Sequence, residues 1–381
     1  MNNNQKALTT SRFAYMDNIR SVIIFSVIAI HAAATYSGIS PWYYVEVTPD
    51  KLSVIELAGF SFFISFLHAW RMGLLFFISA YLTSKSLAKH GPPAFIKARL
   101  VRLGLPLLVY MLVVFPFTKF ILLGKYPENT FAENYIRLFK TSEFFDASGP
   151  LWFVEVLLFF CLIYGIVRHC TSKSIRIRNI TPFGIISIAL LTAIATFFVR
   201  LVFPIGAVVF NLSLSHFTAY IVMLFLGALI GENNLLAKIT DEKNIKFLLL
   251  TPLIGVPIWA FIMIAGGSVN GQLSHLGGFC WQSLLFSIWE LFTAFGFSLG
   301  IIAFFKKKVN HDNKFTKLLR NNSFGVYFLH TPILIAISLA LKKLALSPLL
   351  KFIAVALIAS VLSLLLTYLL KKIKPIGILL K

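Results

Sequence analysis

Ten long apolar runs divide this chain, and they limit its possible folds more than any other feature. A membrane-spanning helix needs about 20 mostly apolar residues. Runs of about that length cover residues 19–37, 56–84, 103–123, 150–168, 181–203, 215–231, 247–266, 279–305, 324–341 and 349–370. Because 58% of the 381 residues are hydrophobic and only 13% are charged, a soluble globular fold is excluded. We predict an all-α fold: one polytopic membrane helix bundle, residues 1–381, with about ten transmembrane helices.

The basic residues lie in clusters between the runs, and their distribution predicts an orientation. Clusters precede the first run and follow the tenth. Others lie between the second and third runs, the fourth and fifth, the sixth and seventh, and the eighth and ninth. Cytoplasmic loops carry such an excess of Lys and Arg. We therefore expect both termini to be cytoplasmic, in a multi-pass protein of a bacterial inner (cytoplasmic) membrane. The net charge of +21 is then explained by the basic loops that orient the protein in the membrane. The lipid bilayer is therefore an expected partner, and nucleic acid is not.

Neither the first run nor the cysteines indicate processing or metal chemistry. The first run contains His31, and Asp17 lies in its basic flank, which is untypical of a cleaved signal peptide. We expect this run to remain as a helix. Cys161, Cys170 and Cys280 are scattered and form no CxxC pair, so they are interpreted as packing residues. No metal site is expected.

Ionisable side chains at membrane depth are the candidates for function, because a charge inside the bilayer is costly. They are His31, His68, Arg71, Glu155, Glu290 and His330, with Asp17 and Arg20 at the cytoplasmic edge. His31 follows Arg20 by eleven residues, which places it about 16 Å deeper, close to the midplane. A histidine there can act as a base or as a nucleophile toward an acyl group. A neutral histidine that only hydrogen-bonds between helices is the alternative.

Glu290 lies in the middle of the eighth run, where a carboxyl group needs a partner or a proton. Arg71 lies at a comparable depth and is the candidate partner. A pair of this kind either takes part in function or only holds two helices together. The sequence leaves both possibilities open.

Two basic clusters lie at helix ends on the expected cytoplasmic side. Arg12, Asp17 and Arg20 open the first run, and Asp17 and Arg20 can pair because they are three residues apart. Arg99 and Arg102 lie just before the third run. Their forked guanidinium groups suit phosphates, on a nucleotide-like cofactor or on lipid head groups. A simple positive membrane anchor is the alternative for the first cluster.

In order and spacing, these motifs resemble those of the acyltransferase-3 family of membrane acyltransferases, over nearly the whole chain. The matching residues are Arg12, Asp17, Arg20 and His31; Phe76-Phe77-Ile78-Ser79-Ala80-Tyr81-Leu82; Arg99-x-x-Arg102-Leu103 and Pro106; Leu151-Trp152-Phe153; Trp289-Glu290; and Ser323-Phe324-Gly325-Val326-Tyr327-Phe328-Leu329-His330-x-Pro332. Two departures are Ala80, where the family usually has glycine, and Arg71, in a stretch that is usually uncharged.

The resemblance implies transfer of an acyl group, commonly acetyl, from acyl-CoA at the cytoplasmic face. The acceptor is a hydroxyl of a carbohydrate or of a lipid-linked glycan of the cell envelope. His31 matches the family's essential histidine, with Asp17 and Glu290 as further catalytic candidates. The residues assigned to donor binding are Arg12, Arg20, Arg99, Arg102, Ser79 and Tyr81. Asp17 lies roughly four turns from His31, too far to orient the imidazole, so the partner of His31 is not identified.

Two other functions remain as alternatives. A proton-coupled secondary transporter would also use buried ionisable groups, and Pro106, Pro116, Pro252 and Pro257 give a faint symmetry between two spans. A non-catalytic membrane scaffold has no need for such groups. Consumption of labelled acyl-CoA by the purified protein would separate the enzyme from both. The sequence does not specify the acceptor.

Overall fold

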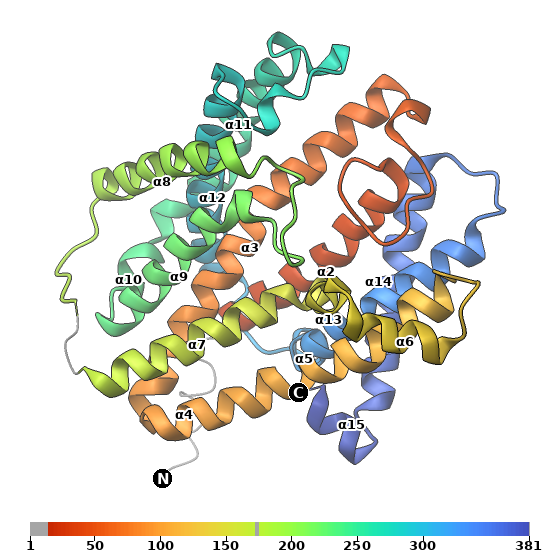
Figure 1. The fold of residues 1–381 in the computed structure, drawn as a ribbon. Helices are drawn as coiled ribbons and strands as arrows, with labels where there is room; N and C mark the ends of the chain where they lie inside the picture. The colour runs from red at the N-terminus through yellow and green to blue at the C-terminus, as the bar shows by residue number, and fades with distance from the viewer. Residues whose placement is uncertain (1–13, 172–174, 381) are drawn as a thin grey trace.

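In the computed structural model, the described residues are 14–171 and 175–380, and they fold into helices joined by loops (Figure 1). The predicted all-α class is confirmed. The helices are α2 (Ala14–Ser37), α3 (Val54–His90), α4 (Pro92–Arg99), α5 (Leu105–Val109), α6 (Phe131–Lys140), α7 (Trp152–Cys170), α8 (Pro182–Val202), α9 (Phe217–Glu232), α10 (Leu236–Ile239), α11 (Phe247–Ala265), α12 (Trp281–Lys308), α13 (Lys314–Leu341), α14 (Pro348–Leu370) and α15 (Lys374–Leu379).

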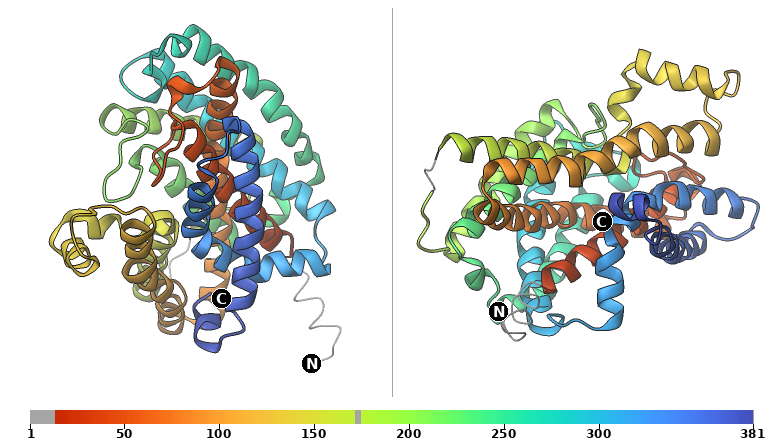
Figure 2. Two further views of the ribbon diagram at one scale, coloured as in Figure 1. Left: turned by 90° about the vertical axis from the view of Figure 1, so that its right-hand side faces the viewer. Right: turned by 90° about the horizontal axis from the view of Figure 1, so that it is seen from below.

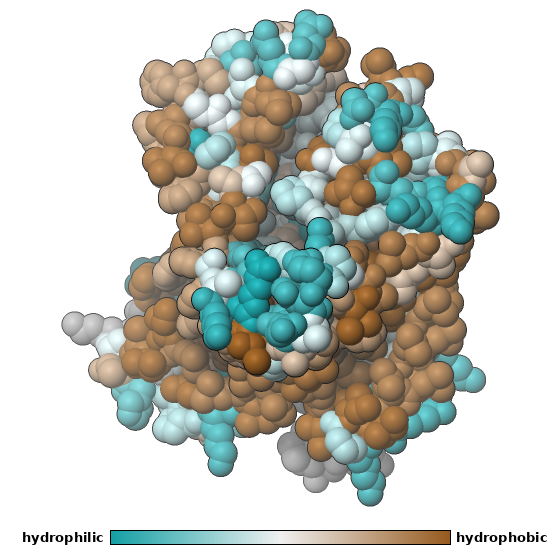
Figure 3. Space-filling model, turned by 45° about the vertical axis from the view of Figure 1, so that its right-hand side comes forward, coloured by the Kyte–Doolittle hydropathy of each residue, from teal (hydrophilic) through white to brown (hydrophobic). Residues whose placement is uncertain are grey.

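Ten helical segments of the described chain are long and apolar enough to cross a membrane, as predicted. In α2, α3 and α12, 61–67% of the apolar window is buried, whereas in α11 and α14 only 17–22% is. The first three therefore form the centre of the bundle and the last two its periphery. Hydrophobic residues cover most of the face shown in Figure 3, with hydrophilic residues gathered in separate patches. The protein is a multi-pass integral membrane protein.

Two spans begin much earlier than predicted, because helices continue past the apolar runs. The third starts at Pro92 rather than near residue 103, and it continues to Leu122 through π-helical turns such as Leu100–Gly104. Proline is favoured at the first positions of a helix, since its missing N–H has no partner there. The ninth starts at Lys314 rather than near residue 324, because Asn313 caps the helix together with Thr316.

Helices α3 and α9 approach each other backbone to backbone. A Cβ atom added at Gly227 would overlap the backbone of Phe77, and one added at Gly231 would overlap the side chain of Ser84. Small residues permit such close contact between membrane helices. The long helix α3 thereby forms the central wall against which the remaining helices pack.

Polar contacts connect the helix ends on one side of the bundle, which we call the basic end. Here α2 begins beside the end of α12, with Asn18 Nδ2 2.8 Å from the carbonyl oxygen of Val309. Lys306, at the end of α12, donates to Thr240 Oγ1 at 2.7 Å. At the other side, the opposite end, α6 projects away from the bundle in both views of Figure 2.

Candidate functional site

His31 projects from α2 into the bundle, where two aromatic rings contact it. Its ring lies parallel to the indole of Trp42, with centroids 3.8 Å apart and an interplanar angle of 14°. At the edge of the ring, its Nδ1 lies 3.0 Å from Nε2 of His330 on α13. The imidazole therefore faces protein rather than lipid, and it keeps a part of its surface accessible.

His330 fixes the protonation pattern of this histidine pair. It is fully buried, and its Nδ1 lies 2.6 Å from the backbone carbonyl oxygen of Tyr327. A carbonyl oxygen can only accept, so Nδ1 of His330 carries the proton and Nε2 of the neutral ring accepts. Nδ1 of His31 must then donate to His330. This leaves Nε2 of neutral His31 with an unshared electron pair.

Trp42 reaches His31 from the loop that joins α2 to α3 at the opposite end. The amide of Glu46 in this loop donates to the carbonyl oxygen of Thr35 at 2.8 Å. The carboxylate of Glu46 also pairs with Lys351 of α14, and both side chains are at most 10% exposed. The loop is therefore folded onto the bundle with the indole as a cover over the imidazole.

Arg71 of α3 lies near the histidine pair, and the candidate pair of Arg71 with Glu290 does not form. The guanidinium is buried, and its Nη1 donates to the carbonyl oxygen of Ser26 on α2 at 3.2 Å. The Nε atom has no hydrogen-bond partner in the described chain. Arg71 therefore holds a positive charge one and a half turns from His31 along α2.

Glu290 instead pairs with Arg200 of α8 and with His216, which precedes α9. One carboxylate oxygen accepts from the guanidinium, and the other lies 2.8 Å from Nδ1 of His216. Arg200 also donates to Ser287 Oγ at 3.0 Å. Depth alone suggested Arg71, but helix neighbours decide the pairing, and α8 and α12 are in close contact.

The Glu290 cluster and the histidine pair both lie close to His68 and Arg71 of α3. His68 of α3 stacks on His216, with ring centroids 5.6 Å apart, and it also experiences the charges of Arg71 and Glu290. The structure thus arranges ionisable groups across the bundle core. It does not bring Glu290 into hydrogen-bond contact with His31, and the catalytic role of Glu290 stays a prediction.

At the basic end, Arg20 and Asp17 form the predicted pair, with Nη1 and Oδ1 3.3 Å apart. Arg99 is half-buried, and its guanidinium lies 5.1 Å from the ring centroid of Phe95, whereas Arg102 is exposed. Arg102 experiences the charges of Arg20, Arg99 and Asp17, so these residues from α2 and the third span are close in space. Their convergence makes a concentrated positive patch.

The remaining residues predicted to bind the donor make no described contact that indicates this role. Ser79 and Tyr81 are buried in α3, where Lys85 Nζ lies 5.9 Å from the Tyr81 ring. Arg12 lies outside the described residues. Roles for these three residues in donor binding stay predictions.

Three residues of the site were not identified as such from the sequence. Arg200 and His216 lie near the ends of apolar runs and resemble residues at the membrane surface. Trp42 lies in a loop outside the apolar runs. A useful signal would have been that Arg200 is a lone cation within a continuous run of apolar residues.

Comparison with known proteins gives one assignment. The profile of the acyltransferase domain family, acyltransferase-3, matches residues 13–372. The chain has no match among curated proteins and none among solved structures. The matched region includes the histidine pair, the Glu290 cluster, Arg99 and Arg102, and it begins directly after Arg12. The chain therefore belongs to the acyltransferase-3 family and is a membrane acyltransferase.

Proposed function

We propose that this protein transfers an acyl group, acetyl in the simplest case, from acyl-CoA to a hydroxyl group of a carbohydrate or cell-envelope glycan. The observation that carries the proposal is the His31–His330 pair. It places an oriented basic nitrogen, Nε2 of His31, inside the bundle. A general base must have its lone pair available toward the hydroxyl proton that it abstracts.

In the proposed reaction, Nε2 of His31 takes the proton of the acceptor hydroxyl as the oxygen attacks the thioester carbonyl. The carbon–sulfur bond breaks, and the coenzyme A thiolate receives the proton back from His31. During this step, Nδ1 of His31 keeps its hydrogen bond to His330, which stabilises the imidazolium. The alternative is that Nε2 itself takes the acyl group before transferring it.

The donor is proposed to bind at the basic end, which we assign to the cytoplasmic face of a bacterial inner membrane. Coenzyme A carries negative phosphates, and Arg20, Arg99 and Arg102 converge there. From Arg20 to His31 is about 16 Å along α2. The thin pantetheine arm can cover this distance while the phosphates remain at the surface.

The acceptor is proposed to enter from the opposite end, beside Trp42. Indole rings stack on the apolar faces of sugars, and Trp42 already stacks on His31. A sugar bound beside Trp42 would bring a hydroxyl to the edge of the imidazole, where the lone pair of Nε2 lies in the ring plane. This arrangement supports a glycan acceptor over a soluble peptide.

The test is transfer of radiolabelled acetyl from acetyl-CoA to an isolated cell-envelope glycan by the purified protein in nanodiscs. His31→Ala is expected to abolish transfer, whereas His311→Ala, an exposed histidine between α12 and α13, leaves it unchanged. Equal activity of wild type and His31→Ala would refute the proposal. Label that remains on the protein when no acceptor is present would favour the acyl-histidine route over the base route.

The buried groups of the Glu290 cluster support a second candidate, a proton-coupled transporter. His216 and Glu290 are in hydrogen-bond contact deep in the bundle, as in proton relays. Proteoliposomes that acidify on addition of a solute but do not consume acyl-CoA would favour this function.

A further inference from the structure

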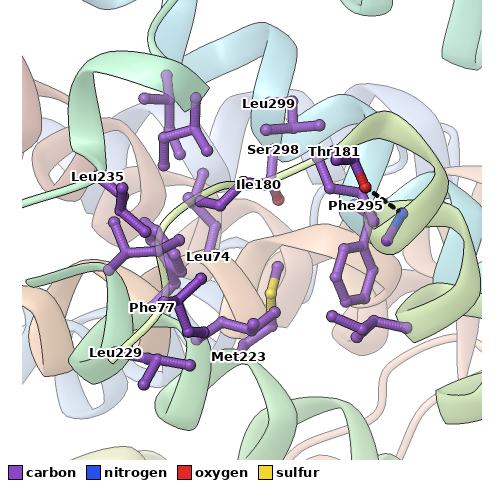
Figure 4. Close-up of a pocket in the computed structure, with 18 of the residues that line it drawn as sticks. Leu74, Phe77, Ile180, Thr181, Met223, Leu229, Leu235, Phe295, Ser298 and Leu299 are labelled. Atoms are coloured by element: carbon purple, nitrogen blue, oxygen red, sulfur yellow. Dashed lines mark hydrogen bonds between the residues drawn. The ribbon is translucent and has the colours of Figure 1, made fainter. Parts of the chain in front are cut away.

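A cavity of about 190 Å³ lies between α3, α8, α9 and α12, next to the basic end (Figure 4). Its walls are almost entirely apolar, with Leu74, Phe77, Ile188, Met223 and Phe295 among them. An apolar cavity of about 150 Å³ is known to accept benzene. There is room here for part of a hydrocarbon chain.

One polar group stands out in this apolar wall. The side chain of Ser298 on α12 lines the cavity and is only 4% exposed. Its Oγ has no hydrogen-bond partner in the described chain, although a helical serine can usually bond to the preceding turn. In the view of Figure 4 it lies beside Ile180, which also lines the cavity. A ligand with a hydrogen-bond acceptor at this depth would satisfy it.

The rim of the cavity is basic. Ile177 and Asn179 line the cavity, so the exposed Arg176 and Arg178 beside them lie at its edge. Neither arginine takes part in an ion pair within the described part of the chain. Lys238 donates to the carbonyl oxygen of Arg178 at 3.0 Å and to Asn179 Oδ1 at 2.7 Å, which leaves a third ammonium hydrogen.

Hydrogen bonds hold the loop at the rim of the cavity in place. Asn233, at the end of α9, accepts from the amide of Ile177 at 3.0 Å and donates to the carbonyl oxygen of Ile175 at 2.9 Å. The two arginines are therefore anchored over the cavity by backbone contacts on both sides. An apolar cavity under fixed cations is complementary to a molecule with a hydrocarbon tail and an anionic head.

We propose that the cavity binds one acyl chain of an anionic membrane phospholipid. The phosphate lies among Arg176, Arg178 and Lys238, and the ester carbonyl accepts a hydrogen bond from Ser298. Basic pockets between membrane helices bind anionic head groups in this way. The occupant is not the reacting acyl chain, because neither α2 nor α13, which carry His31 and His330, contributes to the lining. The proposal is independent of the proposed reaction.

The first test counts lipids that remain bound after the full-length protein is released from nanodiscs, by native mass spectrometry. Wild type is expected to retain one phosphatidylglycerol and to discriminate against phosphatidylcholine. The R176Q/R178Q variant should bind phosphatidylglycerol about thirtyfold more weakly, because each cation near the surface contributes about a fivefold increase in affinity. The matched control is K314Q/K317Q, which removes two exposed charges from the start of α13.

A second variant tests the cavity itself. Ser298→Leu fills it and removes the hydroxyl, so retention of phosphatidylglycerol should be lost, whereas Ser360→Leu on α14 should behave as wild type. Equal retention of the two lipids by wild type, or unchanged retention by Ser298→Leu, overturns the proposal.

A third measurement needs no variant. Phosphatidylglycerol with a diazirine in its acyl chain should crosslink to peptides of α8, α9 or α12 that line the cavity. Crosslinks confined to the peripheral helix α14 would contradict the proposal.

Discussion

Nε2 of His330 lies 3.0 Å from Nδ1 of His31, and this contact joins two helices whose residues are 299 positions apart in the chain. Since Nδ1 of His330 is bound to the carbonyl oxygen of Tyr327, the direction of every proton in the pair is determined. The pair resembles the base-and-orienting-group arrangement of many hydrolases, with an imidazole in place of the carboxylate.

His330 is expected to act as a positioning residue. His330→Ala should lower kcat about a hundredfold, toward the lower limit of what base catalysis contributes, with little change in KM for acyl-CoA. His330→Gln should recover part of the activity, because its amide oxygen can accept from His31. The measurement is steady-state kinetics. If the alanine and glutamine variants lose activity equally, together with their folded fraction, the role of His330 is only structural.

Arg99 and Arg102 are expected to act on donor affinity. A hydrogen bond to a charged group contributes about 1.5–3 kcal/mol, so each change to Gln should raise KM for acyl-CoA at least tenfold while kcat stays near wild type. High salt should reduce the difference. Lys97→Gln, an exposed cation on the same helix, is the control. An effect on acceptor KM alone would contradict a phosphate contact.

The pair of Arg200 and Glu290 is expected to be coupled in stability. Glu290→Gln leaves a buried arginine without its counterion, which costs about 3–5 kcal/mol, and the melting temperature in detergent should fall accordingly. Replacing both residues by Leu and Met should recover most of the loss. Asp241→Asn, which removes an exposed pair with Lys243, should change stability by less than about 1 kcal/mol. Additive losses in the double variant would show that the two residues do not interact.

The loop between α11 and α12 is expected to loosen in acid. Burial, and after it the charge of Arg200, lower the pKa of His275 from 6.5 to about 4. In the open loop the ring has its ordinary pKa, so between about pH 6.5 and 4 the open form binds more protons. The closed loop therefore loses stability as the pH falls. Its Nδ1 contact with Ser268 Oγ, 3.0 Å in length, would open with it.

Hydrogen exchange of residues 266–280 at several pH values, corrected for intrinsic rates, measures this effect. Protection in wild type should decrease below about pH 6, and in His275→Gln it should be nearly independent of pH. Constant protection in wild type would show that the buried histidine does not control the loop.

The spans were predictable because the bilayer imposes a length and a polarity on every helix that crosses it. Their ends were less predictable. The helix that begins at Pro92 has charged residues before its apolar run, and the run alone does not show that the helix includes them. His31 and Glu290 were recognised because charge at depth is costly. Their partners were not, because depth gives the height of a residue in the membrane and not the direction in which it points. For this reason the sequence offers Arg71 as the candidate partner of Glu290, where the structure places Arg200.

The backbone contact between α3 and α9 has a consequence for how the enzyme can open. With Gly227 and Gly231 seated against Phe77 and Ser84, neither helix can slide or rotate without collision, so the two behave as one rigid strut. Any motion that admits substrates must then occur where this helix pair contacts its neighbouring helices, because longer side chains there can change rotamer. A bulky replacement at Gly227 would therefore disrupt the packing of α3 against α9 rather than the path by which substrates enter.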